Sequence, residues 1–96
     1  MVLEIATFDI VPGQEDEFLS AYRTVRDVIA STPGNRSVRM TRVIESPSRF
    51  VLLAEWDTIE AHTENFRGTD RFTTWRAALS PYFAGPPHAE HHSDVE

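Results

Sequence analysis

Cysteine is absent from this 96-residue sequence. Its absence excludes a disulfide framework, a thiolate metal site and a cysteine nucleophile. Lysine is absent too, so all nine basic residues are arginine, against fifteen acidic residues. The net charge of −6 argues against nucleic acid or an anionic membrane as a partner, because both require a basic face.

Long apolar runs and common catalytic signatures are also missing. No stretch approaches the roughly 18 apolar residues of a membrane-spanning helix. Residues 1–13 have neither the charged start nor the apolar centre of a secretory signal, so we expect a cytoplasmic protein. There is no G-x-G-x-x-G, P-loop, G-x-S-x-G or H-E-x-x-H pattern. Candidate functional residues must therefore be sought as polar or charged side chains at positions where a helix or strand is otherwise apolar.

Apolar periodicity predicts six elements in the order strand, helix, strand, strand, helix, strand. The strands are expected at residues 2–10, 36–45, 49–56 and about 87–95, and the helices at about 14–31 and 58–83, with a break at Gly68. Asp57 is the expected cap of the second helical stretch, because Glu60 follows three residues later. This order predicts an α+β ferredoxin-like fold, a split βαβ unit with a four-stranded antiparallel sheet. One domain over residues 1–96 is expected.

The strand at 49–56 is apolar on both faces for most of its length. Phe50, Leu52, Ala54 and Trp56 point one way, and Val51 and Leu53 point the other way. A strand that is apolar on both sides is covered on both sides, and two helices can cover only one face of a small sheet. We therefore expect a homodimer through the sheet faces, a dimeric α+β barrel with a pocket between sheet and helices in each subunit. Whether the last strand contacts the partner subunit is left open.

Two polar side chains share the apolar stripes of the second helical region. Arg76 falls on the same side as Trp75 and Leu79, and His62 recurs with Phe66 at helical spacing. A guanidinium stays charged, so Arg76 has three possible arrangements. It can form a structural ion pair, extend its aliphatic part along the protein so that the guanidinium reaches solvent, or bind an anionic group of a substrate. His62 is either a neutral hydrogen-bonded core residue or a general base, since its ordinary pKa is near neutrality.

Three further features have two interpretations each. Trp56 is either core or a pocket wall whose indole N–H donates to a bound carbonyl. Asn65 lies one step off the stripe of His62, as a surface residue or a polar pocket residue. The last strand contains an H-x-E-x-H pattern, which places three possible metal ligands on one face: His88, Glu90 and His92. The alternative is that this segment is a solvated tail. We predict no metal from it, because the spacing matches no established metal signature.

Three segments together resemble the antibiotic biosynthesis monooxygenase (ABM) domain family over essentially the whole chain. They are "VPGQEDEF", "AEWDTIEAH" and "RFTTWRAALSPYFAGPP". The resemblance implies a dimeric α+β barrel. Between Trp56 and Leu79 the sequence is most similar to the branch of cofactor-free monooxygenases of the actinorhodin pathway. Those enzymes oxidise a tricyclic aromatic polyketide to its quinone without flavin, metal or haem.

The same resemblance implies a set of site residues. The pocket pattern of that branch has an Asn and a Trp on the third strand, a Tyr on the next helix and an Arg on the last helix. Trp56 and Arg76 match it, His62 stands at the Tyr position, and Leu52 stands at the Asn position. His62 keeps a group that can handle a proton, and Leu52 does not. Apolar pocket wall or core is expected from the neighbouring aromatic residues: Phe66, Phe72 and Trp75.

The expected function is therefore a monooxygenase that uses dioxygen and no cofactor. Its substrate is a hydroxylated aromatic compound, polyketide-like or quinol-like, which becomes a quinone. In this hypothesis His62 removes a phenolic proton, Arg76 holds the anion and Trp56 contacts the ring system. One alternative is a non-catalytic dimeric module that binds a small molecule. A haem-degrading monooxygenase is disfavoured, because the first strand has no Asn and the last helix has no His.

Overall fold

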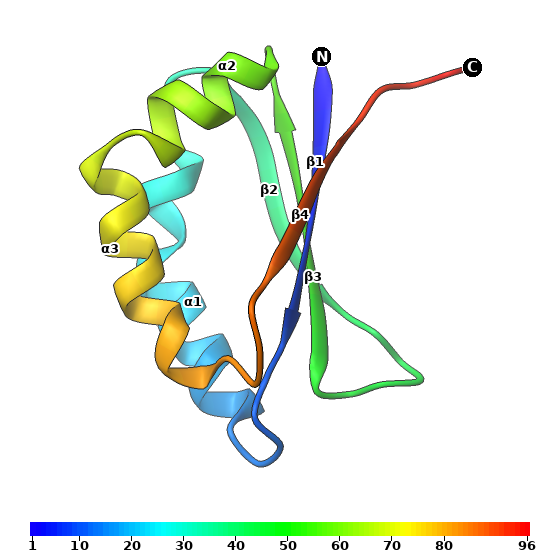
Figure 1. The fold of residues 1–96 in the computed structure, drawn as a ribbon, viewed down its shortest axis with the longest axis vertical. Helices are drawn as coiled ribbons and strands as arrows, with labels where there is room; N and C mark the ends of the chain where they lie inside the picture. The colour runs from blue at the N-terminus through cyan, green and yellow to red at the C-terminus, as the bar shows by residue number, and fades with distance from the viewer.

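A four-stranded antiparallel sheet and a layer of helices form the fold (Figure 1). The computed structural model describes all residues, 1–96. Along the chain the elements are β1 (Val2–Asp9), α1 (Glu15–Ala30), β2 (Asn35–Arg42), β3 (Arg49–Trp56), α2 (Ile59–His62), η1 (Thr63–Arg67), α3 (Asp70–Leu79), η2 (Ser80–Tyr82) and β4 (His88–His92). The strand order is β2-β3-β1-β4, and every neighbouring pair is antiparallel. The predicted α+β ferredoxin-like fold is confirmed.

The helix α1 forms where the sequence combines a charged start with an apolar stripe. Three acidic residues occupy its first turn, where negative charge favours the helix dipole. Its buried side chains recur at helical spacing, and they are Phe18, Tyr22, Val25 and Ile29. The Phe18 ring packs against those of Phe8 and Phe50, with centroids 6.0 and 5.0 Å apart. These contacts fix α1 on the inner face of the sheet.

The central strand β3 is buried on its inner face and half-exposed on its outer face. Phe50, Leu52, Ala54 and Trp56 are each at most 1% exposed. On the outer face, Leu53 lies directly across from Ile5 of β1, with Leu3 and Val51 at the diagonal positions, and all four are half-exposed. We call these four side chains the outer apolar patch. All helices lie on the opposite face of the sheet (Figure 1), so nothing in the chain covers this patch.

Three boundaries differ from the sequence-based predictions. The last strand, expected at about 87–95, is shorter and ends at His92. The strand β2 ends at Arg42, because the chain turns there and leaves Ile44 88% exposed. Thr58, not Asp57, caps α2: its hydroxyl accepts a hydrogen bond from the Ala61 N–H at 3.1 Å, and Asp57 pairs with Arg36. The helix α2 is a single turn that continues as the π-helical η1, a rare form often found near functional sites.

None of the helices has the length and apolar character needed to cross a membrane.

Gly34 closes the turn before β2 directly against α2. Its φ is +93°, and a Cβ there would lie 2.5 Å from the Cβ of Ala61. We expect Gly34→Ala to lower the free energy of unfolding by about 2–4 kcal/mol, because it adds a clash to an unfavourable backbone conformation. Urea denaturation measures this loss.

Gly13→Ala is the matched control for that substitution. Gly13 has a φ of +94°, but a Cβ added to it would meet nothing within 4 Å. Only the backbone penalty of about 1–2 kcal/mol is expected there. Equal losses at the two glycines would show that close contact with α2 contributes nothing.

Candidate functional site

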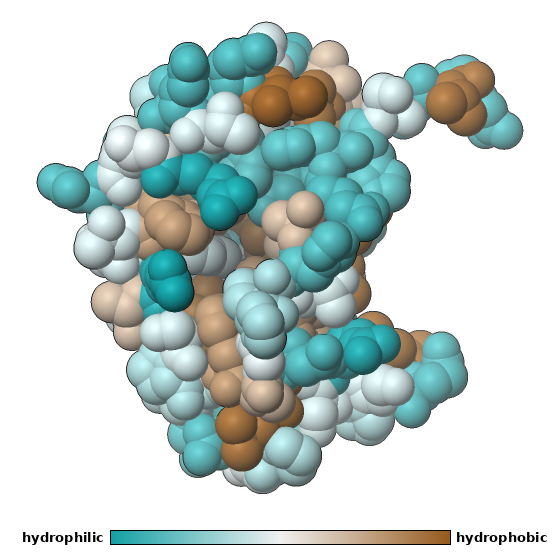
Figure 2. All heavy atoms as spheres, viewed as in Figure 1, coloured by the Kyte–Doolittle hydropathy of each residue, from teal (hydrophilic) through white to brown (hydrophobic).

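A cavity of about 400 Å³ lies between the sheet and the helices. Figure 2 shows apolar surface in the hollow between these two layers. Eight of the fifteen lining residues are hydrophobic, and four lining side chains are charged or titratable: Glu4, His62, Arg67 and Arg76. A cavity of this size with apolar walls and few polar groups is typical of a small-molecule site.

The carboxyl group of Glu4 lies on the inner face of β1, and the residue is only 4% exposed. Its Oε1 accepts a hydrogen bond from Trp56 Nε1 at 3.0 Å. Burial raises the pKa of Glu4, while the Trp56 hydrogen bond and the positive charge of Arg67 act in the opposite direction. The site therefore holds a carboxyl group that retains a proton to a higher pH than an exposed one.

His62 lies at the end of α2 and is 2% exposed. Its Nε2 is 3.4 Å from Glu4 Oε1, and its Nδ1 is 2.8 Å from His91 Nε2. Its ring stacks on Trp56, with centroids 5.0 Å apart. Burial, followed by the effects of His91 and Arg67, lowers the pKa of His62 to about 4. The imidazole is therefore neutral at pH 7 and able to accept a proton.

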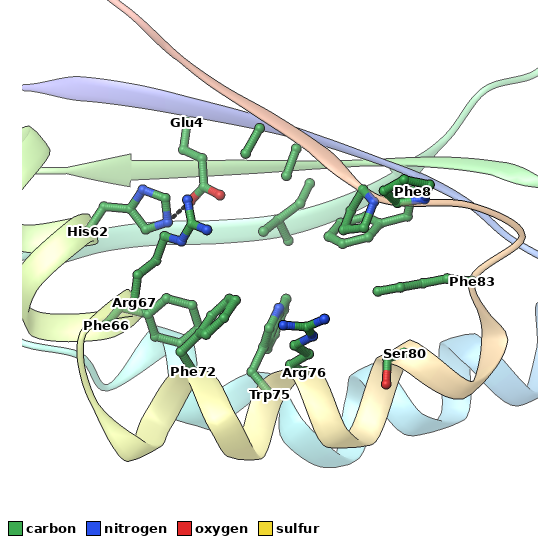
Figure 3. Close-up of a pocket in the computed structure, with 15 residues that line it drawn as sticks. Glu4, Phe8, His62, Phe66, Arg67, Phe72, Trp75, Arg76, Ser80 and Phe83 are labelled. Carbon is green, nitrogen blue, oxygen red and sulfur yellow. Dashed lines mark ion pairs between the residues drawn. The ribbon is translucent and has the colours of Figure 1, made fainter.

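Two arginines line the cavity from the helical side. Figure 3 shows Arg67 of η1 directed toward Glu4 and His62, and Arg76 of α3 beside Trp75. Neither arginine forms a salt bridge with a carboxylate. Both residues are exposed as well as cavity-lining, so their guanidinium groups lie where the cavity opens.

The expectation that Arg76 lies within the buried stripe of its helix is wrong. The buried residues of α3 are Trp75 and Leu79, whereas Arg76 is exposed. Arg76 comes one residue after Trp75 and is therefore turned away from the buried line, toward the edge of the helix face. From this edge its long side chain still lines the cavity.

The structure brings most of the predicted site residues together. Six of them line the same cavity: Leu52, His62, Phe66, Phe72, Trp75 and Arg76. Trp56 does not line it, because the residue is fully buried behind His62 and its N–H donates to Glu4. Asn65 does not line it either, because its side chain is exposed and donates to the Pro33 carbonyl at 2.8 Å. These two residues therefore lie outside the lining of the cavity.

Sequence reasoning missed three residues of this site: Glu4, Arg67 and His91. A signal was available for Glu4, since the alternation of β1 puts it on the same face as Ala6 and Phe8. A carboxyl group on the buried face of a strand is unusual in the same way as a charged side chain on the apolar face of a helix. His91 is also on the inner face of β4, cross-strand from Glu4, but its pairing with His62 depends on the approach of α2.

The three other polar residues of β4 lie on the outer face. Both His88 Nε2 and His92 Nε2 contact the Glu90 carboxylate, at 2.7 and 3.4 Å. No group of three or more potential metal-ligating side chains has the arrangement of a metal site. In the structure these three side chains contact one another at the exposed outer surface.

Comparison with known proteins identifies the family of this chain. Residues 1–78 match the antibiotic biosynthesis monooxygenase family, and the chain belongs to this ABM family. The uncharacterized protein YczJ of Bacillus subtilis is 36% identical over 95 residues, which cover 99% of this chain and 100% of that protein.

Two solved structures show the same fold. A candidate antibiotic biosynthesis monooxygenase from Bordetella bronchiseptica is 32% identical, with a TM-score of 0.94, covering 99% of this chain and 97% of that one. The ActVA-Orf6 monooxygenase of Streptomyces coelicolor, in complex with nanaomycin D, is 24% identical, with a TM-score of 0.84. That match covers 99% of this chain and 88% of the other, and it bears on the fold alone.

Proposed function

We propose that the protein is a cofactor-independent monooxygenase that oxidises a hydroxylated aromatic compound with dioxygen to a quinone. The main support is the composition of the cavity. Aromatic walls enclose a neutral imidazole, His62, and face a guanidinium that has no carboxylate partner, Arg76. Membership of a family that includes cofactor-free monooxygenases supports the same proposal. So does the binding of nanaomycin D by a protein with this fold.

The chemistry starts with removal of a proton from the substrate. A deprotonated, electron-rich aromatic ring can transfer an electron to dioxygen directly, so the protein supplies position, a base and charge stabilisation. His62 accepts the phenolic proton, and Arg76 stabilises the negative charge that spreads over the ring and its oxygens. Phe66, Phe72 and Trp75 pack edge to face and form an aromatic wall against which the substrate ring lies.

Dioxygen then adds to a ring carbon to give a peroxide. The O–O bond breaks, and the carbon loses its hydrogen as a proton. One oxygen atom leaves as hydroxide and takes up a proton to become water, while the other remains as the new carbonyl. Substrate and one molecule of dioxygen thus yield quinone and water. In this proposal Trp56 holds Glu4 and stacks on His62, and does not contact the substrate.

We also propose that two copies of the chain pair through the outer apolar patch. The four half-exposed side chains of the patch are contiguous across β1 and β3, and no element of the chain covers them. Pairing would bury them at low cost, since antiparallel sheets pack well face to face. ABM family proteins are typically dimeric.

Oxygen consumption tests the proposed activity. Protein freed of metal and flavin is mixed with a panel of anthrones and hydroxylated naphthalenes, and oxygen uptake and quinone formation are followed together. With ¹⁸O₂, the quinone is expected to gain one labelled oxygen atom. A module that only binds would be stabilised against heat by the same compounds and would consume no oxygen, and that result would overturn the proposal.

A further inference from the structure

The buried end of the cavity has a direct connection to the protein surface. Glu4 and His62 are 4% and 2% exposed, so both have little direct contact with bulk water. On the far side of the His62 ring, Nδ1 lies 2.8 Å from Nε2 of His91. His91 belongs to β4, whose five residues are all exposed. The two imidazoles therefore join the cavity to solvent.

The geometry of the two rings suits proton transfer. Neutral imidazole donates from one nitrogen and accepts at the other. The Nε2 of His62 faces the cavity and Glu4, and its Nδ1 faces His91. The ring centroids of the two histidines are 5.0 Å apart at an angle of 66°, so the rings meet through their edges and do not stack.

We propose that His62 and His91 form a relay that carries the substrate's proton from the cavity to bulk water, with Glu4 holding the cavity end. This inference rests on the proposed function. A proton arriving on His62 Nε2 is matched by release of the Nδ1 proton to His91 Nε2, and His91 then releases its own Nδ1 proton to water. One proton enters and one leaves, and no electron moves.

The surrounding charges favour movement in this direction. Arg67 of η1 and His91 of β4 both disfavour a lasting positive charge on His62. Glu4 of β1 faces the same ring, and its Oε1 is held by Trp56 of β3. A protonated His62 is therefore short-lived, and passing the Nδ1 proton outward returns the ring to its neutral form. The pair is reset when His62 gives its Nε2 proton to the departing oxygen and a proton returns from water through His91 to His62 Nδ1. His91 is a positioning residue, because it acts through His62 and does not line the cavity.

The relay requires the ring proton of His62 to be on Nδ1, and ¹⁵N NMR of the free protein tests this without any substrate. We expect a neutral His62 at pH 7 with a coupling across the hydrogen bond between its Nδ1 and His91 Nε2. A His62 protonated on Nε2, with no such coupling, would overturn the relay. This measurement decides the relay even if the protein consumes no oxygen.

Two substitutions at residue 91 separate proton transfer from simple support. A glutamine side chain can accept the hydrogen bond from His62 but cannot pass a proton on. We expect both His91→Gln and His91→Ala to lower kcat for oxygen uptake at least tenfold with little change in KM. Added imidazole is expected to restore much of the activity of His91→Ala.

His92→Gln is the matched control, since it changes the next residue of the same strand, on the outer face. It should keep the kcat of the unaltered protein. An active His91→Gln variant would show that the histidine only supports the ring of His62. If the unaltered protein consumes no oxygen but shows the His62–His91 coupling, the proposed function is wrong and the hydrogen-bonded pair of the relay is still supported.

Discussion

Arg76→Ala is expected to lower kcat for oxygen uptake by about 10²-fold or more, the usual effect of removing one group that stabilises transition-state charge. The guanidinium lines the cavity and none of the protein's ion pairs includes it, so its charge is free to meet an anionic substrate. Because the residue is exposed, its loss should change the free energy of unfolding by no more than about 0.5 kcal/mol. Oxygen uptake and urea denaturation on the same preparations check both statements.

Arg23→Ala is the control for that substitution. Arg23 is an exposed arginine on α1 that does not line the cavity, so its loss removes the same charge from elsewhere on the surface. The control variant should retain full activity. An Arg76→Ala protein that oxidises the best substrate as fast as the unaltered one would remove Arg76 from the mechanism.

Leu53→Arg is expected to convert the proposed dimer to monomer. Leu53 lies in the outer apolar patch, and a twofold interface would bury two copies of the new charge without partners. Each unpaired buried charge costs about 3–5 kcal/mol, so the dissociation constant should rise by at least about 10³-fold. Analytical ultracentrifugation over a range of concentrations measures it.

The control adds the same charge on the other side of the molecule. Ala77 is exposed on α3, away from the sheet, so Ala77→Arg should leave the association unchanged. If the Leu53→Arg protein still sediments as a dimer at micromolar concentration, the sheet faces are not the interface.

The fold could be predicted from local patterns. The stripe of α1 and the alternation of β3 are determined by spacings of a few residues, and the structure buries the residues that these spacings select. The element order then restricts the topology to the split βαβ arrangement. The boundary errors at Ile44 and Asp57 arise because neighbouring polar residues compete for a turn or a cap, which local spacing does not resolve.

The candidate site was predictable only in part. The sequence indicates His62 and Arg76 as candidates, because each is a polar side chain next to a run of apolar ones. Glu4 carried the same signal in β1 and was overlooked. Trp56 could not be placed from the sequence, because the partner of its N–H, Glu4, is 52 residues away along the chain.

The sequence alone determined the elements, their order and the apolar faces, because each depends on residues that are close along the chain. Tertiary structure decided which polar groups meet. Glu4 of β1, His62 of α2 and His91 of β4 come within hydrogen-bonding or near hydrogen-bonding distance only when the sheet is assembled and α2 packs across it. The same packing places Asn65 outside the cavity and Arg76 at its edge, since both positions depend on how a helix is rotated against the sheet.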